Sequence, residues 1–503
     1  QSGGSAFELA TPYLEAELFD IKFAQSADVL FICHPNHSAR KLSRTGHTSW
    51  TLTEIDFTDG PYLSPNATST TLTPSGTTGS VNITASASTF VATDVGRLVS
   101  FNSGRAKITG FTSATVVAAT TQVDFADTSA KTDWKLGAFS GTTGHPSCVS
   151  FFEQRLVFAG TLSEPQTLYF SKSGDYENMT TGTNADDAMV YTIASNQVNR
   201  IRYLKAQRTL IVGTTGGEFT VSADGTDAAI TPSNIVIKKQ SSYGTANVDA
   251  IPAGNAVLFL QKAKRKIREL SYNFDTDGYV APDLTILNDI VTKSGINEMS
   301  YQQEPDSILW CVRDDGVLAG LTYQRSENVI AWHRHILGGK FGEATITVTD
   351  FANIADGTKI VFTKSDGTTT TFTSATSATS GKFHSTSSNN QTATNLKTLI
   401  DADADFTATV STNTVTIKET TPQASGFLTI SSGDTTRLAS TDEAHAVVES
   451  AASISGTLTE DEFYVIVKRT INGSTKRFVE VFANFDFDEN DATDFKFLDS
   501  HLT

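Results

Sequence analysis

The sequence predicts a mainly β fold: an irregular β-propeller of about six blades with two inserted β-rich modules, the second of them α+β. Three observations support this prediction. A pair of apolar strands recurs along the chain, and in the middle of the chain it recurs about every 50 residues. Two intervals between neighbouring pairs are longer, and each contains enough additional residues for a separate domain. A repeat of this length built from antiparallel strands is typical of a propeller blade.

The first strand of each pair is a short apolar run. The central residues of these runs are Phe31, Phe158, Val212, Phe259, Trp310 and Val465. About ten residues later a second strand follows, and in five of the six repeats it ends in an apolar residue followed by a hydroxyl, as in Phe170-Ser171. The sixth repeat lacks this ending. Either the N-terminal segment closes the ring, or the propeller is incomplete there.

The repeats and the two excess intervals divide the chain into five parts. We expect insertions between blades, because exposed turns tolerate them. The parts are 1–64 (first blade and entry strands), 65–140 (a small inserted β-barrel or sandwich), 141–340 (blades two to five), 341–446 (an inserted α+β module) and 447–503 (last blade and tail).

The second inserted module has the more varied pattern. A hairpin is expected over 359–372 with its turn at Asp366-Gly367, and a second hairpin over 406–418. Between them, a short helix is predicted at 394–401, since Leu396, Leu399 and Ile400 fall on one face.

Composition narrows the class of protein. The chain has 503 residues, a net charge of −17 and 39% hydrophobic residues, enough for a folded core. Such a charge opposes sequence-specific DNA binding, but it does not exclude a smooth conduit for DNA, where tight binding would be harmful. Three cysteines give no disulfide framework, and we expect Cys33 and Cys311 to be buried and inert. No apolar run is long enough to span a membrane.

One cationic stretch is a candidate contact site. Its five cations are placed by the pattern in the turn between the two strands of the fourth repeat, where lysines commonly protect a sheet edge. A contact with an acidic surface of a neighbouring subunit, or with phosphate, is the functional alternative. The residues are Lys262, Lys264, Arg265, Lys266 and Arg268.

Metal and catalytic patterns are weak. The closely spaced His34, His37 and His47 have no cysteine or acidic residue at ligand spacing, so a polar turn is expected and no metal is assigned. The acidic tail with Asp486, Asp488, Asn490 and Asp491 lacks the glycine and closing glutamate of a calcium loop. No nucleophile elbow, phosphate-binding loop or paired carboxylates stand out. We therefore expect no enzyme activity and no cofactor.

Several strings resemble one known family. CVSFFEQRLVFAG at 148–160 is followed by PQTLYFS at 165–171 and SGDYEN at 173–178, and SADVL at 26–30 precedes HPN at 34–36. DVGRLV at 94–99 lies in the first inserted module. Together these strings resemble the tail nozzle proteins (tail tubular protein B-like) of short-tailed bacteriophages, over most of the chain. Residues 393–418 are similar to a module found in phage tail proteins.

The resemblance implies an architectural role in the virion. Such proteins form a homohexameric ring below the tail adaptor protein, extend the DNA channel, retain the genome and open for ejection. Their partners are other copies of the chain, the adaptor, genomic DNA that passes without sequence readout, and tail fibres as a further candidate. Assembly would take place in the bacterial host cytoplasm. Two alternatives stay open: a glycan-binding (receptor-binding) propeller, using Trp50, Trp134 or Trp332 as aromatic platforms, and a propeller hydrolase.

Overall fold

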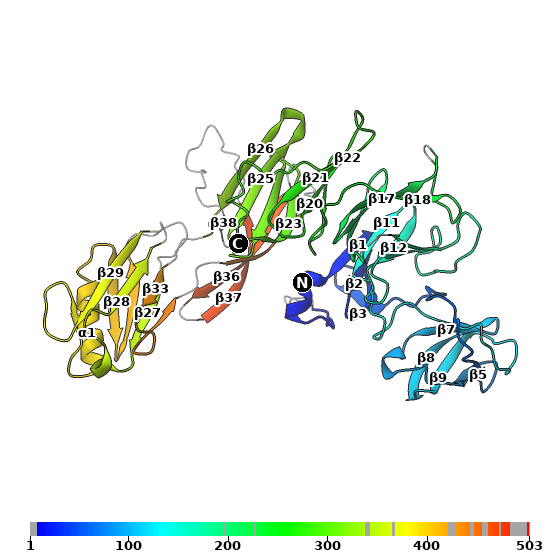
Figure 1. Cartoon of the computed structure of the whole chain (residues 1–503), viewed down its shortest axis with the longest axis horizontal. Helices are drawn as coiled ribbons and strands as arrows, with labels where there is room; N and C mark the ends of the chain where they lie inside the picture. The colour runs from blue at the N-terminus through cyan, green and yellow to red at the C-terminus, as the bar shows by residue number, and fades with distance from the viewer. Residues whose placement is uncertain are drawn as a thin grey trace. The chain divides into compact units, whose positions relative to one another are not determined.

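The computed structural model shows a mainly β chain in two compact units, Gln1–Leu284 and Thr285–Thr503 (Figure 1). None of the described helices has the length and apolar character needed to cross a membrane. The structure describes residues 8–194, 198–225, 228–335, 337, 343–364, 368–420, 428–442, 447–454, 461–471, 474–482 and 500–501. The predicted Asp366-Gly367 turn and the acidic tail at 485–491 lie outside these residues.

The first unit holds four four-stranded antiparallel sheets, each with its strands in sequence order, as in propeller blades. A short 3-10 helix, η1 (Glu15–Asp20), precedes them. Blade 1 comprises β1 (Lys22–Ser26), β2 (Val29–His34), β3 (His37–Gly46) and β4 (Ser49–Glu54). Blade 2 comprises β11 (Cys148–Phe152), β12 (Arg155–Ala159), β13 (Thr167–Phe170) and β14 (Met189–Thr192). Blade 3 comprises β15 (Ile201–Ala206), β16 (Leu210–Thr214), β17 (Gly217–Ala223) and β18 (Ile235–Lys239). Blade 4 comprises β19 (Ile251–Ala253), β20 (Ala256–Leu260), β21 (Ile267–Asn273) and β22 (Gly278–Val280).

The second unit holds two further sheets of the same kind. Blade 5 comprises β23 (Ile296–Gln302), β24 (Ile308–Arg313), β25 (Leu318–Gln324) and β26 (Val329–His335), with η3 (Arg325–Glu327) between the last two. Blade 6 comprises β35 (Val447–Ile454), β36 (Glu462–Ile471), β37 (Ser474–Phe482) and β38 (Ser500–His501). All four described strands of the sixth sheet come from the C-terminal part of the chain, and no described N-terminal strand pairs with them. The six repeats of the sequence therefore correspond to six propeller-type sheets.

The recurring strand pair forms the two central strands of each sheet. Central strands have a strand on each side within their sheet, and every residue of β16, β20 and β24 is buried. The hydroxyl that ends the second strand has a structural role in blade 2, where the Leu156 N–H donates to Ser171 Oγ at 2.9 Å. The sequence pattern thus detected the buried central strands of blades 3, 4 and 5.

Successive blades pack face to face within each unit. In the first unit, apolar clusters join blade 1 to blade 2, blade 2 to blade 3 and blade 3 to blade 4. In the second unit, Trp310 of blade 5 stacks on Phe463 of blade 6, with ring centroids 4.5 Å apart. The first strands are neighbours too: β1 contacts β11, β11 contacts β15, and β23 contacts β35. Face-to-face sheets with their first strands adjacent are the local arrangement of a propeller.

The cysteine prediction is confirmed for burial: Cys33 and Cys311 are buried, as is Cys148, and all three are free thiols. Burial raises the pKa of Cys33 well above its usual value, which keeps the thiol protonated.

The first inserted module is one six-stranded antiparallel sheet, wrapped around its own apolar core. Its strand order is β10-β7-β8-β9-β6-β5. A buried ion pair, Arg97 to Asp94 at 2.8 Å, fixes its short helix η2 (Ala92–Asp94), and Arg97 Nε also donates to the Gly137 carbonyl at 2.6 Å. The strands are β5 (Leu72–Pro74), β6 (Ser80–Ala85), β7 (Leu98–Phe101), β8 (Gly104–Ser113), β9 (Val116–Val123) and β10 (Lys135–Leu136).

The second inserted module has two four-stranded sheets and one α-helix around a shared core, and Figure 1 shows α1 beside them. The helix α1 (Asn389–Ile400) begins five residues earlier than predicted, because Ser388 caps it by accepting from the Gln391 N–H at 3.1 Å. Leu396 and Ile400 are buried, as expected. The strands are β27 (Glu343–Val348), β28 (Lys359–Thr363), β29 (Thr369–Ala375), β30 (Phe383–His384), β31 (Phe406–Ser411), β32 (Thr414–Glu419), β33 (Thr429–Ser432) and β34 (Leu438–Asp442), with η4 (Phe351–Asn353) after β27.

Candidate interaction surfaces and a histidine group

The cationic turn, residues 262–266, connects β20 to β21 in blade 4. Lys262, Arg265 and Lys266 are exposed, and Lys264 is half-buried. The Lys264 backbone has a φ of 60°, and its N–H donates to the Gln261 carbonyl at 2.8 Å, so the turn is tight. Lys266 Nζ pairs with Asp283 at 2.6 Å. The turn therefore presents three cationic side chains to solvent, one of them paired with a carboxylate of its own blade.

Arg268 belongs to the sheet and not to the turn in which the sequence placed it. It lies in β21 with 9% of its surface exposed. Its guanidinium donates to Gln261 Oε1 at 2.8 Å and to the Ala281 carbonyl at 2.7 Å, and it stacks 3.5 Å from the ring centroid of Tyr243. These contacts give Arg268 a structural role between strands, so the candidate contact site reduces to the turn itself.

A buried carboxylate, which the sequence did not reveal, lies near Arg268. Glu218 in β17 is fully buried, and its Oε2 accepts a hydrogen bond from Ser241 Oγ. Its Oε1 has no partner among the described residues, and neither does the hydroxyl of buried Tyr203. Burial raises the pKa of Glu218 to about 7, with the nearby Arg268 charge opposing the shift. The buried carboxyl group therefore retains its proton to a higher pH than an exposed glutamate does.

Gly213 makes room for this buried polar cluster. Tyr203, Gly213 and Glu218 are cross-strand partners in one row over β15, β16 and β17. A Cβ on Gly213 would lie 2.1 Å from Tyr203 Cε1, so the tyrosine ring lies directly over the glycine. In the sequence, the only hints of this cluster are Glu218 and Gly213 within otherwise apolar strands of blade 3. Neither residue identifies the cluster on its own.

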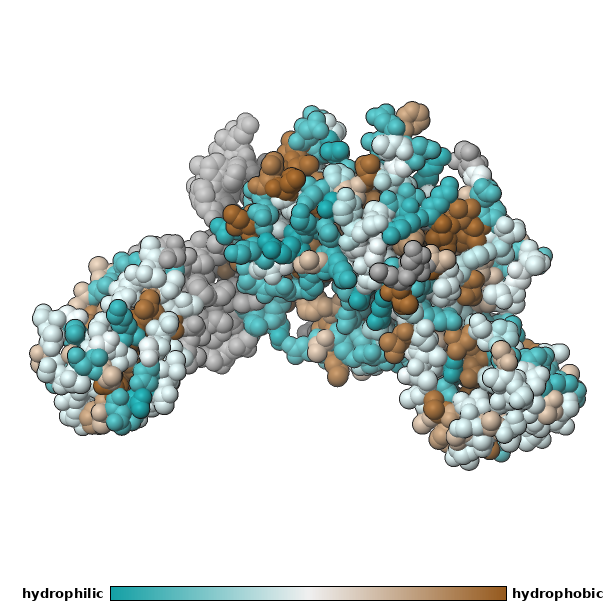
Figure 2. Space-filling model, viewed as in Figure 1, coloured by the Kyte–Doolittle hydropathy of each residue, from teal (hydrophilic) through white to brown (hydrophobic). Residues whose placement is uncertain are grey.

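The N-terminal segment, residues 8–23, exposes several large apolar side chains. The exposed fractions are 66% for Leu14, 52% for Leu18, 55% for Phe19 and 63% for Phe23. Apolar residues are visible among polar ones on the surface of the molecule (Figure 2). Apolar side chains that gather on a surface commonly mark a protein–protein contact.

The same segment is anchored to the propeller on its other side. Asp20 accepts from the amide of Asn247, which precedes β19, at 2.6 Å. Lys22 is buried, and its ammonium donates to the backbone carbonyl of Arg202 in β15. The segment thus crosses from blade 1 to blades 3 and 4, and its exposed apolar residues are held in place.

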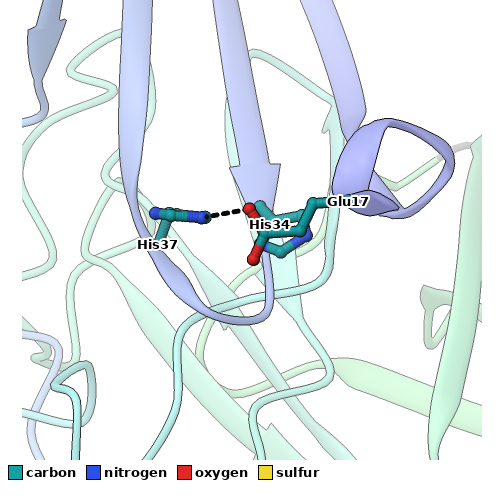
Figure 3. A group of neighbouring side chains, drawn as sticks. All are labelled: Glu17, His34 and His37. Atoms are coloured by element: carbon teal, nitrogen blue, oxygen red, sulfur yellow. Dashed lines mark hydrogen bonds and ion pairs between the residues drawn. The ribbon is translucent and has the colours of Figure 1, made fainter. Parts of the chain in front are cut away.

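A carboxylate and two imidazoles meet beside blade 1 (Figure 3). His34 ends β2, His37 begins β3, and Glu17 comes from η1. His37 Nε2 lies 2.8 Å from Glu17 Oε2, and one ligand atom from each residue can be chosen so that all lie within 4.8 Å of one another. His47 lies apart from the group, with Nδ1 3.3 Å from the Arg44 guanidinium. Two of the three histidines grouped in the sequence analysis, His34 and His37, lie together in the structure. Glu17 was missed because it lies in a separate element, η1, well before them in the sequence.

The tryptophans considered as sugar platforms are engaged in intramolecular contacts. Trp134 packs against the core of the first inserted module and donates from Nε1 to the Thr70 carbonyl at 2.9 Å. The Arg44 guanidinium lies over Trp50, 5.9 Å from the centroid of the indole ring, and Trp50 Nε1 donates to the His47 carbonyl. Trp332 is half-buried in β26. No observation on these rings favours glycan binding.

Comparisons with known proteins add little to this description. No protein-family profile and no curated protein sequence matches the chain. Among solved structures, an auxiliary nutrient binding protein from Bacteroides thetaiotaomicron is 9% identical with a TM-score of 0.27, covering 82% of this chain and 85% of that one. Hsv2p of Kluyveromyces lactis is 9% identical with a TM-score of 0.23, covering 63% of this chain and 96% of that one. These scores are too low to carry an argument about function.

Proposed function

We propose that the chain is a structural virion protein: the nozzle subunit of a short phage tail, which forms a ring, extends the DNA channel below the adaptor, retains the genome and opens for ejection. The resemblance of residues 26–42 and 148–178 to this family supplies the role. The structural observation that supports it best is the anchored N-terminal segment, with Leu14, Leu18, Phe19 and Phe23 exposed. A surface of this kind is suited to contact a second copy of the chain.

The charge of the chain fits a DNA conduit. At −17 the net charge repels phosphate, so DNA moving past the protein would not be held. The screening length at physiological ionic strength is about 8 Å, so the repulsion matters where DNA passes closest to the wall. The proposal names no catalytic group and needs none, since ejection of DNA requires a passage and a gate.

The ring is the property to test first. Purified full-length chain, imaged by negative-stain electron microscopy and weighed by native mass spectrometry, should give rings of about six copies, alone or with the adaptor protein. Labelling of intact particles should place the chain at the distal end of the tail. A stable monomer under all of these conditions, including inside the particle, would contradict the proposal.

A further inference from the structure

We propose that Glu17, His34 and His37 form a binding site for a divalent transition-metal ion, with Zn²⁺ the best fit. Two imidazoles and a carboxylate are the ligand set of an open zinc site that keeps a position for water. Imidazole ligands favour zinc and its neighbours in the first transition row over Mg²⁺ or Ca²⁺, which prefer oxygen ligands. This inference goes beyond the proposed function and does not depend on it.

The backbone brings the three side chains together. His34 and His37 are cross-strand partners on either side of the Pro35-Asn36 turn, so both rings project from the same face of blade 1. The ring centroids are 4.9 Å apart. The Pro35 carbonyl accepts from the His145 N–H at 3.2 Å, which fixes the turn from outside. The two imidazole ligands are therefore held by the fold before any ion arrives.

Glu17 reaches the rings from the N-terminal segment. Its side chain is 18% exposed, and the one of His37 is 23% exposed, so water and ions can enter. The Leu14 N–H donates to Glu17 Oε2 at 3.0 Å, which holds the carboxylate beside the rings. Ligand atoms around Zn²⁺ stand about 3.3 Å apart. The group, whose ligand atoms lie within 4.8 Å, needs to contract by at most about 1.5 Å.

An orphaned polar atom points to a missing partner. His34 is 1% exposed, and its Nε2 has no hydrogen-bond partner among the described residues. Its Nδ1 accepts the Asn36 N–H at 3.1 Å, so a neutral ring carries its proton on Nε2, where nothing accepts it. A buried group left unpaired in this way is costly unless another species satisfies it.

A metal ion would resolve this arrangement by taking a lone pair of His34. Binding through Nε2 moves the ring proton to Nδ1 and displaces the Asn36 N–H. Binding through Nδ1 would replace the Asn36 N–H but leave the Nε2–H unpaired, so Nε2 is the ligand atom that the buried ring favours. The ion would bind both Glu17 and His37 and so replace their direct contact. Metal binding would therefore attach the N-terminal segment more firmly to blade 1.

The test uses the full chain, purified without a histidine tag and freed of metal by chelation. Titration with ZnCl₂ by calorimetry, with Mg²⁺ as the comparison ion, should show one tight Zn²⁺ site and no Mg²⁺ binding. Glu17→Gln and His37→Ala should each weaken Zn²⁺ binding by at least about tenfold. Circular dichroism confirms that each variant is folded.

The matched control is His47→Ala, which removes an exposed histidine of the same blade outside the group. It should bind Zn²⁺ like the unaltered chain. Absence of Zn²⁺ binding would overturn the proposal. So would binding that survives both Glu17→Gln and His37→Ala, because the ion would then be held elsewhere.

Discussion

At the scale of single residues, the chain places ionisable groups inside its blades where their charge state matters. Glu218 is the clearest example, because it is fully buried and has one carboxylate oxygen without a partner among the described residues. Tyr203 and Glu218 face the same side of blade 3 across Gly213. Blade 3 therefore carries a polar cluster within its apolar packing.

Glu218 should make the stability of the first unit depend on pH. Its folded pKa of about 7 lies above the ordinary value of 4.5, so the folded state binds the extra proton between these two pH values. Stability is then fully present below about pH 4.5 and decreases as the pH rises through 7, by up to about 3 kcal/mol. Glu218→Gln should remove this loss, raising the unfolding temperature more at pH 8 than at pH 5.

The matched control for this experiment is Glu327→Gln, since Glu327 is an exposed glutamate in η3. Calorimetric scans of both variants at the two pH values separate a buried-charge effect from a general loss of negative charge. If Glu218→Gln and the unaltered chain lose stability in parallel between pH 5 and pH 8, the buried carboxylate is not the cause.

Residue-scale predictions from the sequence succeeded where burial alone decided the outcome. Cys33 and Cys311 lie at the same place in their repeats, and both are buried. Prediction failed where the partner comes from a distant segment. Glu17 belongs to η1 and reaches His37 only through the fold, and Arg268 turns inward because Gln261, Tyr243 and Ala281 surround its guanidinium.

At the scale of elements, the sequence predicted the middle of each blade better than its borders. The strands β16, β20 and β24 are buried throughout, so they appear in the sequence as unbroken apolar runs. The strand β1 (Lys22–Ser26) is half exposed and carries no such run. The start of α1 was placed too late because the cap at Ser388 lies before the apolar face of the helix.

The cationic turn gives a prediction at this scale. If it contacts an acidic surface of a neighbouring subunit, the double variant Lys262→Glu with Arg265→Glu should weaken ring assembly. Rising salt should weaken assembly of the unaltered chain as well. The stability of the monomer should change little, because both side chains are exposed. Native mass spectrometry measures assembly, and calorimetry measures stability.

The comparison variant is Arg268→Ala, which should destabilise blade 4 by about 2 kcal/mol or more, since it leaves buried acceptors unpaired.

A gel-shift assay with double-stranded DNA tests the other role considered for the turn. Assembly that is unchanged in the double variant while DNA binding is lost would assign the turn to phosphate and not to a neighbouring subunit.

At the scale of the whole molecule, the chain combines a scaffold of similar sheets with inserted modules that have cores of their own. Six sheets of one design provide the scaffold, and the two modules with their own cores are inserted between blades. Such modules can change in sequence without disturbing the packing of the blades, because their apolar residues are buried within themselves. The anchored N-terminal segment is one place where the scaffold leaves large apolar residues exposed, and under the proposed function a ring contact would bury them.

The final prediction concerns this segment as a contact between copies. The double variant Leu14→Ser with Leu18→Ser should reduce the assembled fraction by at least about tenfold, because an apolar side chain buried at an interface stabilises association by about 1.5 kcal/mol or more. Light scattering coupled to gel filtration measures the assembled fraction. Leu162→Ser is the control, since Leu162 is 69% exposed but lies in the β12–β13 connection. Equal losses in both variants, or intact rings in the first, would show that the N-terminal segment does not form the contact.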